Sequence, residues 1–212
     1  MPVNLANLKF INQKIKSLSQ NVDLMAVTKN RPKEDVLNLI KNGVKIFGEN
    51  RVQEAKEKFS DLFSRDNFSL HLIGPLQTNK VKDALKIFNT IQTIDRIKLV
   101  DEIVKLLNKD FVKTNSFYIQ INIGHEDQKS GVHKEDLDFL YKYSLDNGLN
   151  IQGFMCIPPA NQDPTPYFQE MIKLKDKINS QLKLSMGMSN DYDTALSFNT
   201  NLIRLGSILF ND

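Results

Sequence analysis

Lys29 follows a short apolar run, residues 24–28, and precedes a polar loop that ends at Pro32. This pattern is typical of a buried strand that opens into a loop. We expect the lysine there to lie half in a dry interior and half in a pocket, where dehydration disfavours the ammonium form. A neutral amine is a nucleophile that can form a Schiff base with an aldehyde. The alternative is an ordinary surface lysine at the end of a strand.

Two segments near the carboxyl end of the chain have residue types that suit an anion. The first contains Met188 and Ser189, and the second contains Gly206 and Ser207. Glycine lets the backbone approach an anion closely, and a serine hydroxyl donates a further hydrogen bond. Each segment alone could be a tight turn, but together they predict a phosphate site.

Three more polar residues lie in or beside apolar runs. Arg204 is inside the run 202–205, where it must be paired or must bind a ligand, and a salt bridge within the protein is the alternative. His71 could contact a ring-shaped ligand or could be a core imidazole with satisfied hydrogen bonds. Asn50 could line a pocket or cap a helix.

Short apolar runs alternate with amphipathic segments along the whole chain. The expected strands are residues 24–28, 44–48, 70–74, 90–93, 116–123, 151–157, 182–186 and 202–205. The expected helices are residues 1–20, 33–42, 50–63, 78–88, 97–107, 134–147, 167–181 and 191–199.

This alternation predicts a parallel sheet, because parallel neighbours need a crossover connection. Eight such units in 212 residues favour one compact (β/α)₈ barrel of the TIM type over residues 1–212, without a second domain. An open doubly wound sheet usually has a glycine-rich turn after its first strand, and the turn at residues 28–32 contains no glycine. In a barrel, sites form at the C-terminal ends of the strands, and phosphate commonly binds after strands seven and eight. The two serine-containing segments fall there.

The composition excludes several classes of protein. A net charge of +3, evenly spread, does not indicate binding to nucleic acid. The single cysteine, Cys156, fits a reducing compartment, and neither a signal peptide nor a membrane-spanning run is present, so we expect a cytoplasmic protein. The spacing of the three histidines predicts no metal site, and His125 and His133 are expected on the surface.

Several segments, taken together, match one family. The chain resembles the pyridoxal 5′-phosphate (PLP) homeostasis proteins, the YggS/PROSC group. The matching segments are residues 26–29, 47–54, 71–80, 122–131, 153–155, 184–191 and 204–210, together with Pro158.

The resemblance implies a PLP-binding barrel similar to the N-terminal domain of alanine racemase, PLP fold type III. It implies that Lys29 holds PLP as an internal aldimine and that Arg204 faces the pyridine nitrogen. The other implied roles are phosphate binding by Ser189, Gly206 and Ser207, and a ring pocket lined by Asn50 and His71 with Met188 nearby.

The resemblance further implies PLP storage or transfer without strong catalysis. An arginine at the pyridine nitrogen leaves PLP a weak electron sink. The expected partners are PLP and PLP-dependent apoenzymes, and the chain is expected to be a monomer or a weak homodimer. A PLP-dependent amino-acid racemase is the main alternative. A barrel that acts on a sugar phosphate without PLP, and a plain interaction module, also stay open.

Overall fold

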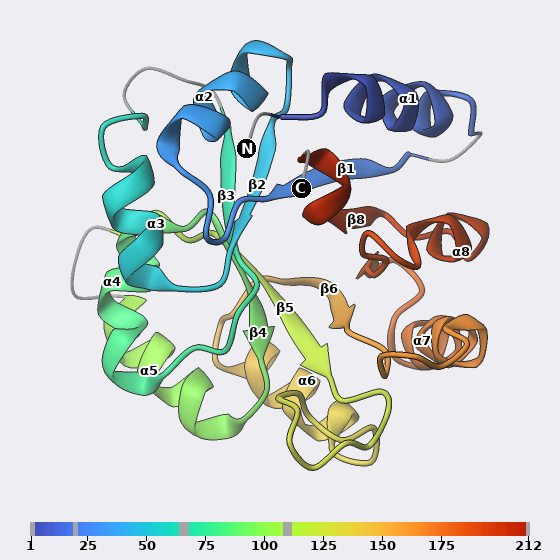
Figure 1. Ribbon diagram of the computed structural model, residues 1–212. Coiled ribbons are helices and arrows are strands. Elements are labelled where there is room, and N and C mark those ends of the chain that lie inside the picture. Colours follow the sequence, from blue (N-terminus) through green and yellow to red (C-terminus); the bar gives the residue numbers. More distant parts are fainter. Residues whose placement is uncertain (1–2, 19–20, 64–67, 108–111, 211–212) are drawn as a thin grey trace.

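The structure is a computed structural model that describes residues 3–18, 21–63, 68–107 and 112–210. Its strands form a closed barrel in the order β1 to β8, and every neighbouring pair is parallel. The predicted barrel is therefore confirmed, and the open doubly wound sheet is excluded. The helices lie around the outside of the strands (Figure 1).

Each of the eight predicted strands is present, with ends that differ from the prediction by at most two residues. The strands are β1 (Asp23–Val27), β2 (Ile46–Glu49), β3 (Ser69–Leu72), β4 (Thr90–Ile94), β5 (Ser116–Ile121), β6 (Ile151–Cys156), β7 (Lys183–Ser185) and β8 (Leu202–Leu205).

The predicted helices are also present, and several are shorter than their amphipathic patterns. They are α1 (Leu5–Lys16), α2 (Lys33–Lys41), α3 (Val52–Phe59), α4 (Val81–Ile87), α5 (Ile97–Leu107), α6 (Leu137–Asp146), α7 (Thr165–Ile178) and α8 (Tyr192–Ser197). The 3₁₀ turns η1 (Thr78–Lys80) and η2 (Ser207–Leu209) precede α4 and follow β8.

The strands are held between two sets of buried side chains. Phe47, Leu70, Ile119 and Phe154 are fully buried strand residues in the hydrophobic cluster that also takes in the inner faces of the helices. Strand residues with polar side chains, such as Arg204, are buried as well. A parallel sheet covered by helices has this character, because both faces of each strand are removed from water.

The two ends of the described chain pair with each other. Val3 forms an antiparallel bridge with Phe210, and the Asn4 N–H donates to the Leu209 carbonyl at 2.8 Å. The Asn7 side-chain amide donates to the Ile208 carbonyl at 3.0 Å. Helix α1 is thereby attached to η2, the turn that follows the last strand.

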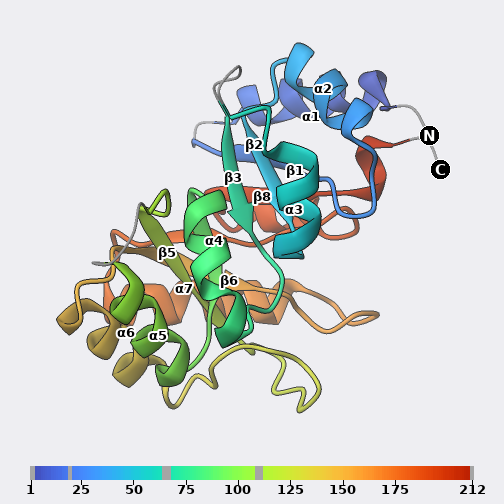
Figure 2. The same cartoon turned by 90° about the vertical axis from the view of Figure 1, so that its left-hand side faces the viewer.

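The connection from β5 to α6 forms a long loop that extends away from the strands (Figure 2). Within the described ranges, every helix is too short or too polar to cross a bilayer.

Candidate functional site

Four neighbouring strands position most of the residues predicted from the sequence. β7, β8, β1 and β2 are adjacent in the closed barrel. Ser189 follows β7, Arg204 lies in β8, and Lys29 and Asn50 follow β1 and β2. We call the loops after these four strands the rim.

Lys29 lies in a tight turn directly after β1. The Arg31 N–H donates to the Thr28 carbonyl at 3.0 Å, and Asn30 has a φ of 59°, a left-handed value that asparagine adopts more readily than most residues. The Lys29 side chain is exposed. The expectation of a half-buried lysine is therefore wrong, because the residue lies in a turn beyond the end of the strand.

A buried ion cluster supports this turn from below. The Lys58 ammonium donates to Glu49 Oε1 at 2.7 Å, to Glu54 Oε1 at 2.9 Å and to the Thr28 carbonyl at 2.6 Å. The Thr28 hydroxyl donates to Glu49 at 2.7 Å, and the Asn30 N–H donates to Glu54 at 2.5 Å. The residues on both sides of Lys29 are thus fixed by the same charged cluster.

Burial dominates the electrostatics of the cluster. The Glu49 side chain is fully buried, which raises the pKa of its carboxyl group, although the hydrogen bonds from Lys58 and Thr28 oppose the shift. Sequence reasoning missed this cluster. The i, i+4 spacing of Glu54 and Lys58 on α3 indicates an ion pair, but nothing in the sequence places that pair beneath β1.

The loops after β7 and β8 meet at one hydroxyl. The Ser189 Oγ accepts hydrogen bonds from the Gly206 N–H at 3.2 Å and from the Ile208 N–H at 3.5 Å. Ser207, between them in sequence, is exposed, and Met188 is half-buried. The predicted phosphate-binding segments therefore lie together, with backbone donors converging on one point.

The β7 loop has a conformation that only glycine fits at its start. Gly187 has a φ of +97°, and a Cβ atom there would lie 2.6 Å from the Cβ of Ala195. The following turn closes when the Met188 N–H donates to the Asp191 carboxylate at 2.5 Å. These two features fix the position of Ser189.

Arg204 extends into the barrel and is 3% exposed. Its guanidinium donates to Ser185 Oγ at 2.9 Å and to the Cys156 carbonyl at 2.7 Å. Burial lowers its pKa from the ordinary value, yet an arginine stays charged at neutral pH. Both partners are neutral groups, so the arginine is held as a donor and its charge is not cancelled by either of them.

A line of hydrogen bonds continues from Arg204 through the barrel. Ser185 donates to the Gln92 side-chain oxygen at 2.7 Å, and the Gln92 amide lies 2.9 Å from His71 Nδ1. His71 Nε2 in turn lies 2.9 Å from Ser69 Oγ. Sequence reasoning singled out Arg204 and His71 but not the side chains that connect them, Ser185 and Gln92.

The line ends in a cavity of about 650 Å³ on the opposite side of the barrel. We call it the base cavity, since its lining comes mostly from the first residues of the strands. Those residues include Asp23, Ile46, Thr90, Ser116, Lys183 and Leu202.

His71 lines the base cavity and not the rim. The structure therefore separates it from Lys29 and Ser189, and its expected place in the ring pocket is corrected. Burial lowers the pKa of its imidazole to about 3, so it is a neutral, hydrogen-bonded core histidine. Tyr118 lines the same cavity, and its pKa is raised to about 12 by burial and by the charge of Asp23.

Asn50 is half-buried and lines a cleft of about 500 Å³ between the loops that follow β2 and β3. Gly74 of the second loop packs directly on it, because a Cβ atom at Gly74 would lie 2.2 Å from the Asn50 carbonyl oxygen. Gln77 and Lys80 line the same cleft. Asn50 is thus a pocket residue at the rim.

The rim residues fit a phosphorylated aldehyde. The two N–H groups gathered at Ser189 suit an anion, and the buried Arg204 supplies a fixed positive charge beneath. Lys29 follows β1, which pairs with β8: a Cβ atom at Gly206 would be 3.7 Å from Val27, two residues before the lysine. The ends of these adjacent strands therefore carry an exposed amine and two converging N–H donors, and β8 itself carries a buried cation.

Residues 3–212 match the family model described as the N-terminal domain of alanine racemase. The pyridoxal phosphate homeostasis protein of Aquifex aeolicus is 35% identical over 198 residues, which are 89% of this chain and 86% of the relative. The protein of the same name from Pasteurella multocida is 34% identical over 96% of this chain and 92% of its own.

The chain belongs to the pyridoxal phosphate homeostasis protein family.

Solved structures agree with this assignment. PipY of Synechococcus elongatus, solved without PLP, superposes with a TM-score of 0.87 at 27% identity, covering 97% of this chain and 99% of PipY. PipY with PLP bound superposes with a TM-score of 0.82 over 97% of this chain and 100% of PipY. Alanine racemase of Clostridium difficile shares the fold, with a TM-score of 0.78 at 15% identity over 100% of this chain and 58% of the racemase.

Proposed function

We propose that this protein binds PLP at the rim and keeps it in balance within the cell, by storing it or handing it to PLP-dependent enzymes. The observation that carries the proposal is the meeting of Ser189 with Gly206, directly after β8, next to the Lys29 turn that follows β1. Arg204 is buried within the same strand, β8. Membership of the PLP homeostasis family and the likeness to PLP-bound PipY support it.

The phosphate group would be bound by the Gly206 and Ile208 N–H groups together with the Ser189 and Ser207 hydroxyls. Ser207 is exposed beside the two converging donors, so its hydroxyl is accessible to an incoming anion. Met188 and Asn50 would lie near the ring. His71 has no part in this arrangement, since it faces the base cavity.

Arg204 would face the pyridine nitrogen as a permanent hydrogen-bond donor. Bound PLP supplies an aldehyde that reacts with amines and a ring that can withdraw electrons. A donor that cannot accept a proton keeps the ring nitrogen unprotonated, so the electron withdrawal stays weak. This favours holding and exchanging PLP over carbanion chemistry, and we propose that the protein is not an enzyme.

Lys29 would form the covalent bond to PLP through its Nζ atom. Its exposure leaves the amine accessible, and the Lys58 cluster fixes the turn that carries it. Because the side chain is exposed, replacing it removes the amine without disturbing the core.

The test is borohydride reduction of the PLP-loaded protein followed by peptide mass mapping. We expect the label on Lys29, and we expect Lys29→Ala to lose the visible absorption band of protein-bound PLP while its far-UV circular dichroism is unchanged. Lys56→Ala, which removes another exposed lysine on α3, is the matched control and should keep both band and label. A label on a different lysine, or an unchanged band in Lys29→Ala, would contradict the proposal.

A further inference from the structure

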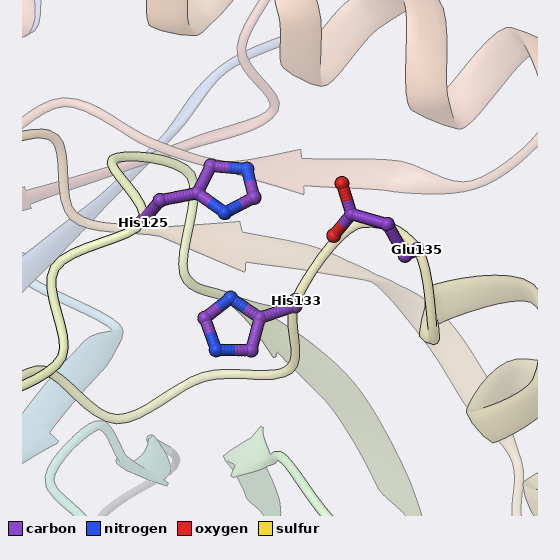
Figure 3. Close-up of side chains that lie close together, drawn as sticks. All are labelled: His125, His133 and Glu135. Atoms are coloured by element: carbon purple, nitrogen blue, oxygen red, sulfur yellow. The ribbon is translucent and has the colours of Figure 1, made fainter.

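Three side chains of the β5–α6 loop point toward one another (Figure 3). His125, His133 and Glu135 are all exposed, and each offers a ligand atom within 4.8 Å of those of the other two. The two imidazole rings stack, with centroids 5.4 Å apart and planes inclined by 21°. Two nitrogen ligands and one oxygen ligand therefore converge outside the rim residues that the PLP proposal uses.

The backbone around these side chains is fixed at both ends. The His125 N–H donates to the Asn122 carbonyl at 3.2 Å, and the Asn122 side-chain oxygen accepts from the Glu126 N–H at 3.1 Å. His125 itself has a φ of 51°, an uncommon left-handed value for a residue other than glycine. The turn thus holds His125 in one conformation.

His133 is anchored to the barrel through its neighbour. Val132 forms an isolated bridge with Ile121 of β5. The Val132 N–H donates to the Gln120 carbonyl at 2.9 Å, and the Val132 carbonyl accepts from the Asn122 N–H at 3.0 Å. The Asp136 N–H donates to the His133 carbonyl at 3.0 Å, which fixes Glu135 in the turn before α6. The backbone conformation is therefore set before any ligand arrives, and little ordering is left to oppose binding.

We propose that His125, His133 and Glu135 form a Zn²⁺ site. Imidazole nitrogen suits Zn²⁺, Cu²⁺ and Ni²⁺, whereas Mg²⁺ and Ca²⁺ prefer sites made of oxygen alone. Ligand atoms around a tetrahedral zinc ion lie about 3.3 Å apart, given Zn–N distances of about 2.0–2.1 Å. Rotation of exposed side chains closes the remaining gap. Three protein ligands leave a fourth position for water or for a group from another molecule.

Sequence spacing did not indicate this site. The histidines are separated by seven residues, and the third ligand is a glutamate in a following turn. The bridge between Val132 and β5 folds the loop back on itself and brings the three together. The proposal does not depend on PLP binding, because none of these residues belongs to the rim.

The experiment is a calorimetric titration of ZnCl₂ into the tag-free, PLP-free protein, since both a histidine tag and PLP bind zinc. We expect one Zn²⁺ per chain and a raised Tm in its presence. The double variant H125A/H133A should lose the binding, and Glu135→Gln should weaken it at least about tenfold. Asp136→Asn removes the neighbouring exposed carboxylate and should bind as the wild type does. MgCl₂ should give no binding.

The remaining histidine is buried in the barrel, so the exposed pair accounts for histidine-dependent binding. All four substituted residues are exposed, so the metal-free variants should stay folded, although alanine at the left-handed position of His125 should lower the Tm of H125A/H133A. Equal zinc affinity in the double variant and the wild type would overturn the site. Unchanged affinity in Glu135→Gln would overturn the three-ligand arrangement.

Discussion

The polar groups at the two ends of the barrel differ in their exposure to solvent and in whether loops or strands carry them. At the rim, Lys29 and Ser207 are exposed, and the donors at Ser189 lie on loops. At the base cavity, most of the polar groups belong to the strands themselves, and His71 is only 7% exposed. The base has the larger cavity, about 650 Å³, against about 500 Å³ for the cleft beside Asn50.

This difference shows that the volume of a cavity does not locate the chemistry of a barrel. Strand residues cannot move without breaking the sheet, whereas loop residues can rearrange around a ligand. The base cavity is lined by side chains that hydrogen-bond to one another, as Thr90 and Ser116 do. The rim has an exposed amine and an exposed serine hydroxyl beside its backbone donors, and a buried cation lies in the adjoining strand.

The largest effect is expected from breaking the ion cluster beneath the rim. Lys58→Met leaves Glu49 and Glu54 without their shared cation, and the fully buried Glu49 cannot be solvated. Removing one partner of a buried ion pair costs about 3–5 kcal/mol of unfolding free energy. Urea denaturation measures it. Lys56→Met, on the exposed side of the same helix, should change the stability by less than about 0.5 kcal/mol.

Lys58→Met also tests whether the cluster supports the Lys29 turn. Since Lys58 donates to the Thr28 carbonyl, the variant should load PLP more slowly even at temperatures where it stays folded. If it lost stability but labelled Lys29 at the wild-type rate, the cluster would be a packing feature alone.

His71, which lines the base cavity, should make the free energy of unfolding depend on pH in the acid range. The folded pKa of about 3 lies below the ordinary value of 6.5, so the unfolded chain takes up a proton at higher pH than the folded one. The stability contributed by the neutral ring is complete above pH 6.5 and is lost as the pH falls toward 3. Between pH 6.5 and 4.5 this amounts to at most about 2–3 kcal/mol.

Denaturation curves over that pH range would measure the effect. His71→Gln should flatten the profile of stability against pH, because it removes the buried imidazole. If His71→Gln kept the wild-type slope of stability against pH, the His71 imidazole would not be the source of that slope.

The smallest effect is expected at the connection between the two ends. Ser185→Ala leaves Arg204 Nη1 and the Gln92 side-chain oxygen without their shared hydroxyl, at a cost of about 1–3 kcal/mol. Ser180→Ala, at an exposed serine after α7, is the control. If rim and base are coupled, a double-mutant cycle of Ser185→Ala with His71→Gln should give an interaction energy of at least about 0.5 kcal/mol. Strict additivity would mean that the two ends are independent.

The fold could be predicted from the sequence because each strand is a short apolar run bounded by polar turns. Residues 202–205 were predicted with the correct ends, since the run is apolar apart from Arg204. The helix expected over residues 134–147 begins only at Leu137, because the preceding residues form the turn in which the Asp136 N–H bonds to His133. Amphipathic spacing cannot distinguish such a turn from a first helical turn.

The site was predicted less completely, and the reasons are spatial. Lys29, Ser189 and Gly206 were predicted at one end of the barrel, because residues at C-terminal strand ends meet at one face, and their role in binding PLP stays a prediction. His71 was misplaced because the alternation of side chains along β3 predicts that His71 points into the barrel. It does not predict whether the side chain lies nearer the rim or the base cavity. Lys58 had only the i, i+4 signal of its pairing with Glu54, which does not place it against Glu49 of a different element.

The hydroxyl of Ser189 already accepts the hydrogen bonds of the two N–H groups that a phosphate would need. A phosphate oxygen that enters replaces one acceptor by another, so the protein exchanges bonds and gains few new ones. The hydrogen bonds at Ser189 would then contribute little net free energy to binding the phosphate. A carrier needs that balance, because a group gripped too firmly could never be passed on.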